Sequence, residues 1–123
     1  MTVFSHDMKY LSDTNLRQRI RDLEDACERN LKLAETAAKD CDAVGVARAL
    51  RLAEGALDRH LVSMNALAKR MKGGKDSPFV KQHRALQDGH AQRLEFDVRT
   101  FAGFVDMCEC RIVRQKPQMR YKY

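Results

Sequence analysis

Three histidines within segments of helical periodicity are the first residues in this sequence that could do chemistry. His83 and His90 lie seven positions apart, which places them on one face of a helix, and His60 lies beside the apolar seam of an earlier helix. Imidazoles in such positions could bind a metal ion or a haem, with Cys108 as a further ligand. The alternative is that the histidines form polar layers in or beside the core of a helical bundle.

The spacing of His83 and His90 favours the second interpretation. Seven residues of helix separate two side chains by about 10 Å along the axis, which is too far for both to bind one small ion. Metal ligands on a single helix are usually three or four residues apart. We therefore expect polar layers, which set helix register at some cost in stability, and we expect no metal and no cofactor.

The four cysteines show no spacing that is typical of a zinc or redox site. Cys108 and Cys110 flank a single glutamate, whereas such sites usually use CxxC, and positions i and i+2 of a helix point to different sides. No cysteine or serine has a recognisable base and orienting acid at the spacing of a known family. The phosphate-binding patterns GxxxxGK[ST] and GxGxxG are also absent. We expect no enzymatic activity.

The start of the chain lacks a cationic segment followed by an apolar one, so a secretory signal is not expected. Reduced thiols in the cytoplasm are therefore the expected state of the cysteines, with two disulfides in a secreted protein as the alternative. No apolar run approaches the roughly 20 residues of a membrane span, so a membrane partner is not expected.

Positive charge is the most informative chemical feature of the chain. It carries 23 Lys/Arg and 17 Asp/Glu, a net charge of +6, and the excess lies in residues 69–84 and in the segment from Arg111 to the end. Such clusters bind nucleic-acid phosphates or an acidic protein surface; the alternative is a solvated turn and a solvated tail. Tyr121 and Tyr123 could stack on unpaired bases. The candidate anion-binding or partner-binding residues are Arg17, Arg19, Arg21, Lys69, Arg70, Lys72, Lys75, Lys81, Arg84, Arg111, Arg114, Arg120 and Lys122.

Helical periodicity identifies the first element that positions these residues. Ser12, Asp13 and Thr14 are good N-cap residues, and the steps of three and four that follow predict a helix over 13–40. Its expected apolar seam is Leu16, Ile20, Leu23, Cys27, Leu31, Ala34 and Ala38. The sequence KDCD then predicts a short turn.

A heptad pattern without proline predicts a second helix over 42–72, with a packed-bundle or coiled-coil seam. The expected seam is Val46, Leu50, Ala53, Leu57, Leu61, Met64, Ala68 and Met71. Gly45 and Gly55 each weaken this helix by about 1 kcal/mol relative to alanine if they lie in its interior. Gly73 and Gly74 are expected to end it, because glycine readily adopts the left-handed conformation.

Ser77 followed by Pro78 predicts the start of a third helix over 77–115, with serine as N-cap and proline in the first turn. Its expected inner face is Val80, His83, Gln87, His90, Leu94, Val98, Phe101, Val105, Cys108 and Ile112, widened by Phe79, Leu86 and Phe104. Pro117 lies beyond its end and begins the basic tail.

The pattern as a whole predicts an all-α fold, an up-down-up bundle of three long antiparallel helices in a single domain over 1–116. Residues 1–11 form an apolar lead-in that should pack on the bundle, and 117–123 form the tail. In this topology the second turn lies at the same end as the start of the first helix. We therefore expect the cations of residues 69–84 to lie close to Arg17, Arg19 and Arg21.

These features favour a small non-enzymatic binding protein: an adaptor, inhibitor or regulator that docks on a macromolecular complex through helical faces and basic ends. Phage and plasmid accessory proteins, including inhibitors of host defence, often have this size. The alternative is a nucleic-acid-binding accessory protein, and a weaker one is a secretion or flagellar-type chaperone, which the net charge of +6 disfavours. A seam containing His83, Gln87 and His90 also suggests self-association as a two-fold dimer.

Overall fold

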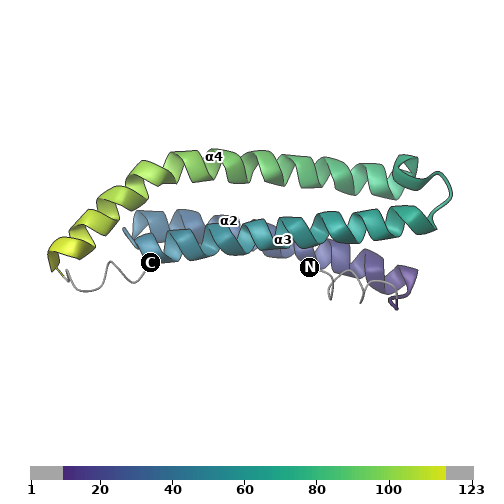
Figure 1. The fold of residues 1–123 in the computed structure, drawn as a ribbon, viewed down its shortest axis with the longest axis horizontal. Coiled ribbons are helices and arrows are strands. Elements are labelled where there is room, and N and C mark those ends of the chain that lie inside the picture. Colours follow the sequence, from purple (N-terminus) through teal and green to yellow (C-terminus); the bar gives the residue numbers. More distant parts are fainter. Residues whose placement is uncertain (1–9, 116–123) are drawn as a thin grey trace.

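The fold consists of three long helices that run up, down and up (Figure 1). The computed structural model describes the backbone of residues 10–115 and the side chains of residues 10–102. The helices are α2 (Asp13–Lys39), α3 (Ala43–Arg70) and α4 (Pro78–Gln115), and a turn of 3-10 helix, η1 (Gly74–Asp76), precedes α4. The all-α bundle expected from the sequence is confirmed, and each helix end falls within two residues of its expected position.

Side-chain oxygens cap the start of each helix, because the first amide groups of a helix have no partner within it. The hydroxyl of Ser12 accepts from the Asn15 amide at 3.1 Å, and the carboxylate of Asp42 accepts from the Gly45 amide at 2.9 Å. The hydroxyl of Ser77 accepts from the Val80 amide at 3.4 Å, so the expected Ser-Pro start of the third helix is confirmed.

Left-handed backbone conformations make both turns tight. In the first turn Cys41 has φ 56°, and the Asp42 amide donates back to the Ala37 carbonyl at 2.8 Å, which satisfies one of the last carbonyls of α2. In the second turn Gly73 and Gly74 have φ 88° and 54°. These two glycines follow the end of α3, as the sequence predicts.

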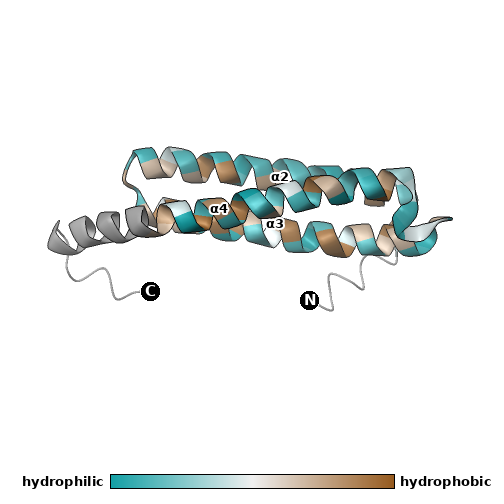
Figure 2. Cartoon of the chain, turned by 90° about the horizontal axis from the view of Figure 1, so that it is seen from above, coloured by the Kyte–Doolittle hydropathy of each residue, from teal (hydrophilic) through white to brown (hydrophobic). Residues whose placement is uncertain are grey.

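The core lies along α3, which packs against both other helices, whereas the contact between α2 and α4 is smaller. Figure 2 shows the alternation of hydrophilic and hydrophobic residues along each helix that such packing requires. The buried apolar side chains form two clusters. One consists of Leu16, Ile20, Met64 and Leu67, and the other of Cys27, Leu31, Ala53, Ala56 and Leu57.

Among the described side chains, the expected apolar seams are wrong at Leu61 and Val98, and Leu86, expected to widen the inner face of the third helix, is 41% exposed. The expected inner residues Phe104, Val105, Cys108 and Ile112 lie outside the residues whose side chains the structure describes. Leu61 and Val98 are 38% and 48% exposed, while their neighbours His60 and Asp97 are buried at 1% and 4% exposure. His60 follows Leu57 by three positions and precedes Met64 by four, so its place on the helix turns it inward whatever its polarity. At both places the polar neighbour is buried and the apolar residue is exposed, because position on the helix decides which side chain faces the core.

Of the expected lead-in, only Tyr10 and Leu11 belong to the described residues. Leu11 packs against the first apolar cluster, and Tyr10 is 76% exposed. Over the part of the chain that the structure describes, no helix is both long enough and apolar enough to cross a membrane.

The Asp42 cap makes a prediction about two glycines. A Cβ on Gly45 would lie 2.3 Å from the Asp42 carboxylate, whereas a Cβ on Gly89, in α4, would meet nothing within 4 Å. Gly45→Ala should therefore displace the cap and lower the free energy of unfolding by about 1 kcal/mol. Gly89→Ala should raise it by up to about 1 kcal/mol, because alanine favours the helix. Urea unfolding followed by circular dichroism measures both; an equal gain from the two substitutions would show that the cap is absent.

Candidate functional site

A group of four polar side chains, two buried and two partly buried, joins the three helices, and we call it the Glu24 cluster. Glu24 comes from α2, His60 from α3, and His83 and Gln87 from α4. It lies between the two apolar clusters, since Glu24 is placed along α2 between Ile20 and Cys27. The cluster is thus a polar interruption of an otherwise apolar core.

A single carboxylate oxygen is shared by two imidazole rings. The Oε2 atom of Glu24 lies 2.6 Å from Nε2 of His60 and 2.5 Å from Nδ1 of His83. The other ring nitrogen of His60, Nδ1, lies 2.6 Å from Oε1 of Gln87. Each helix therefore contributes at least one atom to a continuous hydrogen-bonded chain.

The cluster is shielded from solvent. The side chains of His60, His83 and Glu24 are 2%, 8% and 11% exposed. Burial opposes ionisation of Glu24, but the hydrogen bonds and charge interactions with His60 and His83 outweigh it and lower the pKa of Glu24 below its usual value. The carboxyl group is therefore an ionised acceptor at neutral pH.

The protons of the cluster follow from this ionised carboxylate. A carboxylate only accepts, so each ring nitrogen that faces it must carry a hydrogen or share a cation with it. In the tautomer that carries a hydrogen on Nδ1, His83 donates to this carboxylate. Two arrangements of His60 satisfy this rule. In the first, Nδ1 donates to Gln87, and Nε2 must then carry a second proton or bind a metal ion together with Glu24. In the second, the Gln87 amide is rotated and donates to Nδ1, and Nε2 carries the hydrogen that faces Glu24.

The cluster corrects the interpretation of the histidines. His60 and His83 lie in the core, as the polar-layer interpretation expects, but they meet each other through Glu24 and not through His90. The spacing of His83 and His90 along one helix gives no information about a cluster whose residues come from three helices. The missed residue, Glu24, does carry a signal, because it follows Ile20 by four positions and precedes Cys27 by three.

The second candidate site is one end of the bundle, which we call the cationic end. There the start of α2, the end of α3, η1 and the start of α4 come together (Figure 1). Residues 10–22 and 61–86 contain nine Lys/Arg against three Asp. The basic residues are Arg17, Arg19, Arg21, Lys69, Arg70, Lys72, Lys75, Lys81 and Arg84.

Several of the arginines at the cationic end are held by neighbouring side chains. The guanidinium groups of Arg17 and Arg21 lie 4.6 and 5.6 Å from the centroid of the Phe79 ring. Arg70 donates to the Leu11 carbonyl at 2.6 Å and to Asp13 at 3.1 Å. Arginines of α2 thus meet an aromatic ring of α4, and an arginine of α3 meets the start of α2, as the topology predicts.

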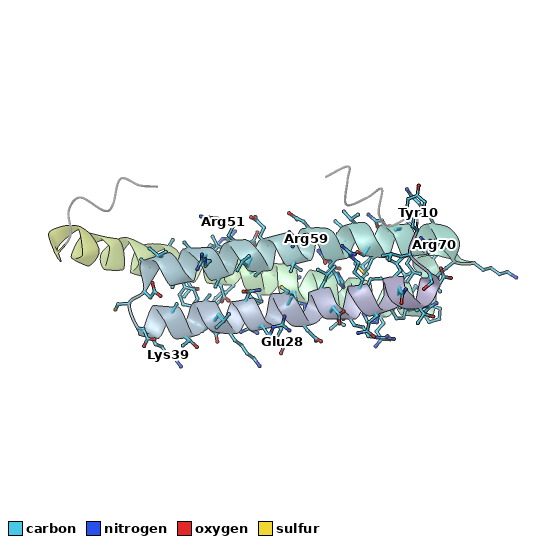
Figure 3. The ribbon with its side chains drawn as sticks, turned by 90° about the horizontal axis from the view of Figure 1, so that it is seen from below. Tyr10, Glu28, Lys39, Arg51, Arg59 and Arg70 are labelled. Carbon is cyan, nitrogen blue, oxygen red and sulfur yellow. The ribbon has the colours of Figure 1, made fainter. Side chains whose placement is uncertain are left out.

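The lysines of the cationic end have the opposite character, because Lys69, Lys72, Lys75 and Lys81 are all exposed to solvent. Figure 3 labels Tyr10 and Arg70 at this end of the molecule and Lys39 at the other. The remaining candidates, Arg111, Arg114, Arg120 and Lys122, lie outside the residues whose side chains the structure describes.

Among the described residues, two of the grooves lie between pairs of helices. One of about 290 Å³ lies between α2 and α3 and includes the exposed side chains of Leu33 and Leu52 in its lining. The other, of about 450 Å³, lies between α3 and α4 and includes Gln87. Neither lining includes a carboxylate or imidazole of the Glu24 cluster.

The buried thiol and the second buried carboxyl have perturbed pKa values. Burial raises the pKa of Cys27 to about 11, so it is a neutral thiol. Cys27 and Cys41, the cysteines among the described side chains, form no disulfide. Burial also raises the pKa of Asp97, with Glu35 adding to this effect and Arg93 opposing it. The Oδ2 atom of Asp97 has no hydrogen-bond partner among the described residues.

Comparison with known proteins leaves the function to be argued from this geometry. No protein-family model matches the chain, and neither a curated protein nor a solved structure is significantly similar to it.

Because two imidazoles share the Glu24 carboxylate, removing Glu24 should lower stability much more than removing the neighbouring Glu28. Glu24→Ala should lower the free energy of unfolding by about 3 kcal/mol, because both imidazoles lose a buried partner. Glu28→Ala, one turn further along α2, removes a half-exposed side chain whose Lys32 contact spans 3.7 Å, and should change stability by less than about 0.5 kcal/mol. Urea unfolding of both variants is the measurement, and similar losses would contradict the shared hydrogen bonds.

Asp97 predicts a pH-dependent stabilisation. Its pKa is higher in the folded than in the unfolded protein, so its ionised form destabilises the fold above the folded pKa, and this cost disappears as the pH falls below the unfolded value. Asp97→Asn should therefore stabilise the protein by about 1 kcal/mol at pH 7 and have little effect near pH 3. Unfolding curves across this range test the sign, and a benefit that grows on acidification would refute it.

Proposed function

We propose that this protein is a small non-enzymatic binding protein, an adaptor, inhibitor or regulator that docks on an acidic surface of a protein complex through its cationic end. The observation that carries the proposal is the separation of charge along the bundle. The cationic end has nine Lys/Arg and three Asp, whereas residues 23–60 and 87–102 together have eight Lys/Arg and eleven Asp/Glu.

The helices reinforce the charge at this end. α2 and α4 begin there, and the unpaired amides at a helix start carry partial positive charge; α3 ends there and offsets one of the two. Four exposed lysines add mobile charges that steer an anionic partner towards the end before contact. The arginines held by Phe79 and Asp13 supply a fixed surface beside them.

A protein partner is favoured over a nucleic acid by the apolar surface elsewhere on the bundle. Leu33 and Leu52 are 57% and 53% exposed and share one groove, and Phe96 on α4 is 66% exposed. Phosphate contacts make no use of such side chains, whereas protein interfaces combine apolar contacts with a charged rim. Nucleic-acid binding remains the second candidate because exposed Tyr10 lies at the cationic end, where it could stack on a base (Figure 3).

The same proposal includes a cytoplasmic location with reduced thiols and no catalytic role. The histidines of the Glu24 cluster support the absence of catalysis, because they are buried and line neither groove. Self-association as a two-fold dimer stays a hypothesis, and light scattering tests it: a mass of one chain at micromolar concentration would exclude it.

Charge reversal at the cationic end tests the proposal. The variant carries Lys69→Glu, Lys72→Glu, Lys75→Glu and Lys81→Glu, which lowers the net charge from +6 to −2 and spares Arg70, whose contacts are structural. The control carries Arg29→Glu, Lys39→Glu, Arg48→Glu and Arg51→Glu, an equal change among exposed residues elsewhere. Both are compared with wild type in affinity capture with mass spectrometry, followed by measured affinity for the recovered protein.

The proposal requires a partner that wild type and control retain and that the cationic-end variant binds at least about 100-fold more weakly. Binding to generic DNA or RNA, titrated against salt, tests the second candidate. Four phosphate contacts would give a slope of about −3.6 in log affinity against log salt on duplex DNA. Such a slope, lost in the cationic-end variant alone, would replace the protein partner with a nucleic acid. Equal losses in both variants would reject the cationic end as the docking surface.

A further inference from the structure

We infer that Glu24, His60 and His83 form a binding site for one divalent transition-metal ion of the zinc class, at the point where all three helices meet. Three donor atoms, Oε2 of Glu24, Nε2 of His60 and Nδ1 of His83, lie within 4.8 Å of one another. Two imidazoles and one carboxylate are a ligand set that binds Zn²⁺ with a fourth position left for water. The proposal is independent of the docking function proposed for the cationic end.

The distances are compatible with a metal after a small movement. Zinc lies about 2.0–2.1 Å from nitrogen and oxygen ligands, so tetrahedral ligand atoms are separated by about 3.3 Å. The oxygen of Glu24 is now 2.5–2.6 Å from the two nitrogens, which is the separation of hydrogen-bonded atoms. The carboxylate would move away from each nitrogen by about 0.8 Å, and the two nitrogens, which lie within 4.8 Å of each other, would have to reach a similar separation of about 3.3 Å. Rotations about the side-chain bonds of the glutamate and of both histidines are the movements available for this.

Gln87 supplies the support that metal-bound histidines usually have. Its Oε1 lies 2.6 Å from Nδ1 of His60, so this nitrogen can donate its hydrogen and leave the lone pair of Nε2 directed at Glu24. Metal binding would replace the hydrogen between Nε2 of His60 and Oε2 of Glu24, and both atoms would become ligands of the ion.

The surroundings suit a structural metal. His60 and His83 are buried at 1% and 6% exposure, and the Phe79 ring packs on His83 with centroids 4.1 Å apart. Gln87 lies both in the cluster and in the lining of the groove between α3 and α4, so this groove reaches the residue that contacts His60. A metal here would link α4 to α2, the pair of helices with the smaller contact.

The test uses tag-free, full-length protein that is treated with EDTA, dialysed, and titrated with ZnCl₂ or CoCl₂. We expect one ion per chain, a dissociation constant of about 1 μM or lower, and the visible absorption of four-coordinate cobalt. Saturating zinc should raise the melting temperature by about 5–15 °C. Because Cys108 and Cys110 could also bind zinc, the same result is required of the Cys108→Ser/Cys110→Ser protein.

Matched variants assign the ligands. His60→Gln and His83→Gln should abolish stoichiometric binding, while His90→Gln, on the same helix as His83 but outside the cluster, should keep it. Gln87→Ala retains all three ligands and should weaken binding by about 10–100-fold. Circular dichroism of the metal-free variants verifies that they fold, and Gln87→Ala keeps the test decisive if a ligand variant does not. No binding by wild type at 100-fold excess zinc, or equal binding by wild type and both ligand variants, would overturn the site.

Discussion

The bundle depends on one carboxylate oxygen that two histidines from two other helices share. A buried carboxylate is costly unless it is hydrogen-bonded, and Glu24 finds its partners only when α3 and α4 both present an imidazole at the same level along α2. Sliding any helix by one turn would leave these groups facing apolar side chains. The Glu24 cluster therefore favours this register of the helices, whereas the flanking apolar clusters tolerate many packings.

The same constraint reaches the cationic end through Phe79. The ring of Phe79 packs on His83 and lies beneath the guanidinium groups of Arg17 and Arg21. A continuous series of contacts thus runs from the buried carboxylate to the surface arginines and connects α4 with α2, where direct packing is smaller. The arrangement of the charged end follows from the position of α4, and the hydrogen bond between His83 and Glu24 contributes to that position.

Helix number, direction and boundaries could be predicted from the sequence because caps, glycines and apolar spacing are local signals. Ser77-Pro78 and Gly73-Gly74 marked the second turn, and the topology then placed Arg17 near it. The direction in which an individual side chain faces is harder to predict from the sequence. Polarity predicts Leu61 and Val98 in the core, yet His60 and Asp97 occupy the inner positions. The Glu24 cluster is not predictable in this way, because its residues come from three helices. Which of them meet depends on the relative register of these helices, and local sequence signals do not give that register.

Asp97 shows why a polar residue on an inner face needs its own explanation. Glu24 and Asp97 are both carboxylates on inner faces, but burial is outweighed only at Glu24, whose pKa falls, while that of Asp97 rises. The difference is the supply of donors: two imidazoles meet Glu24, whereas the nearest cation to Asp97, Arg93, lies at 3.9 Å and is bonded to Glu35 at 2.9 Å. A buried carboxylate therefore stabilises this bundle at Glu24, where histidines of two other helices hydrogen-bond to it. It destabilises the bundle at Asp97, where the partner is one arginine of the same helix at 3.9 Å.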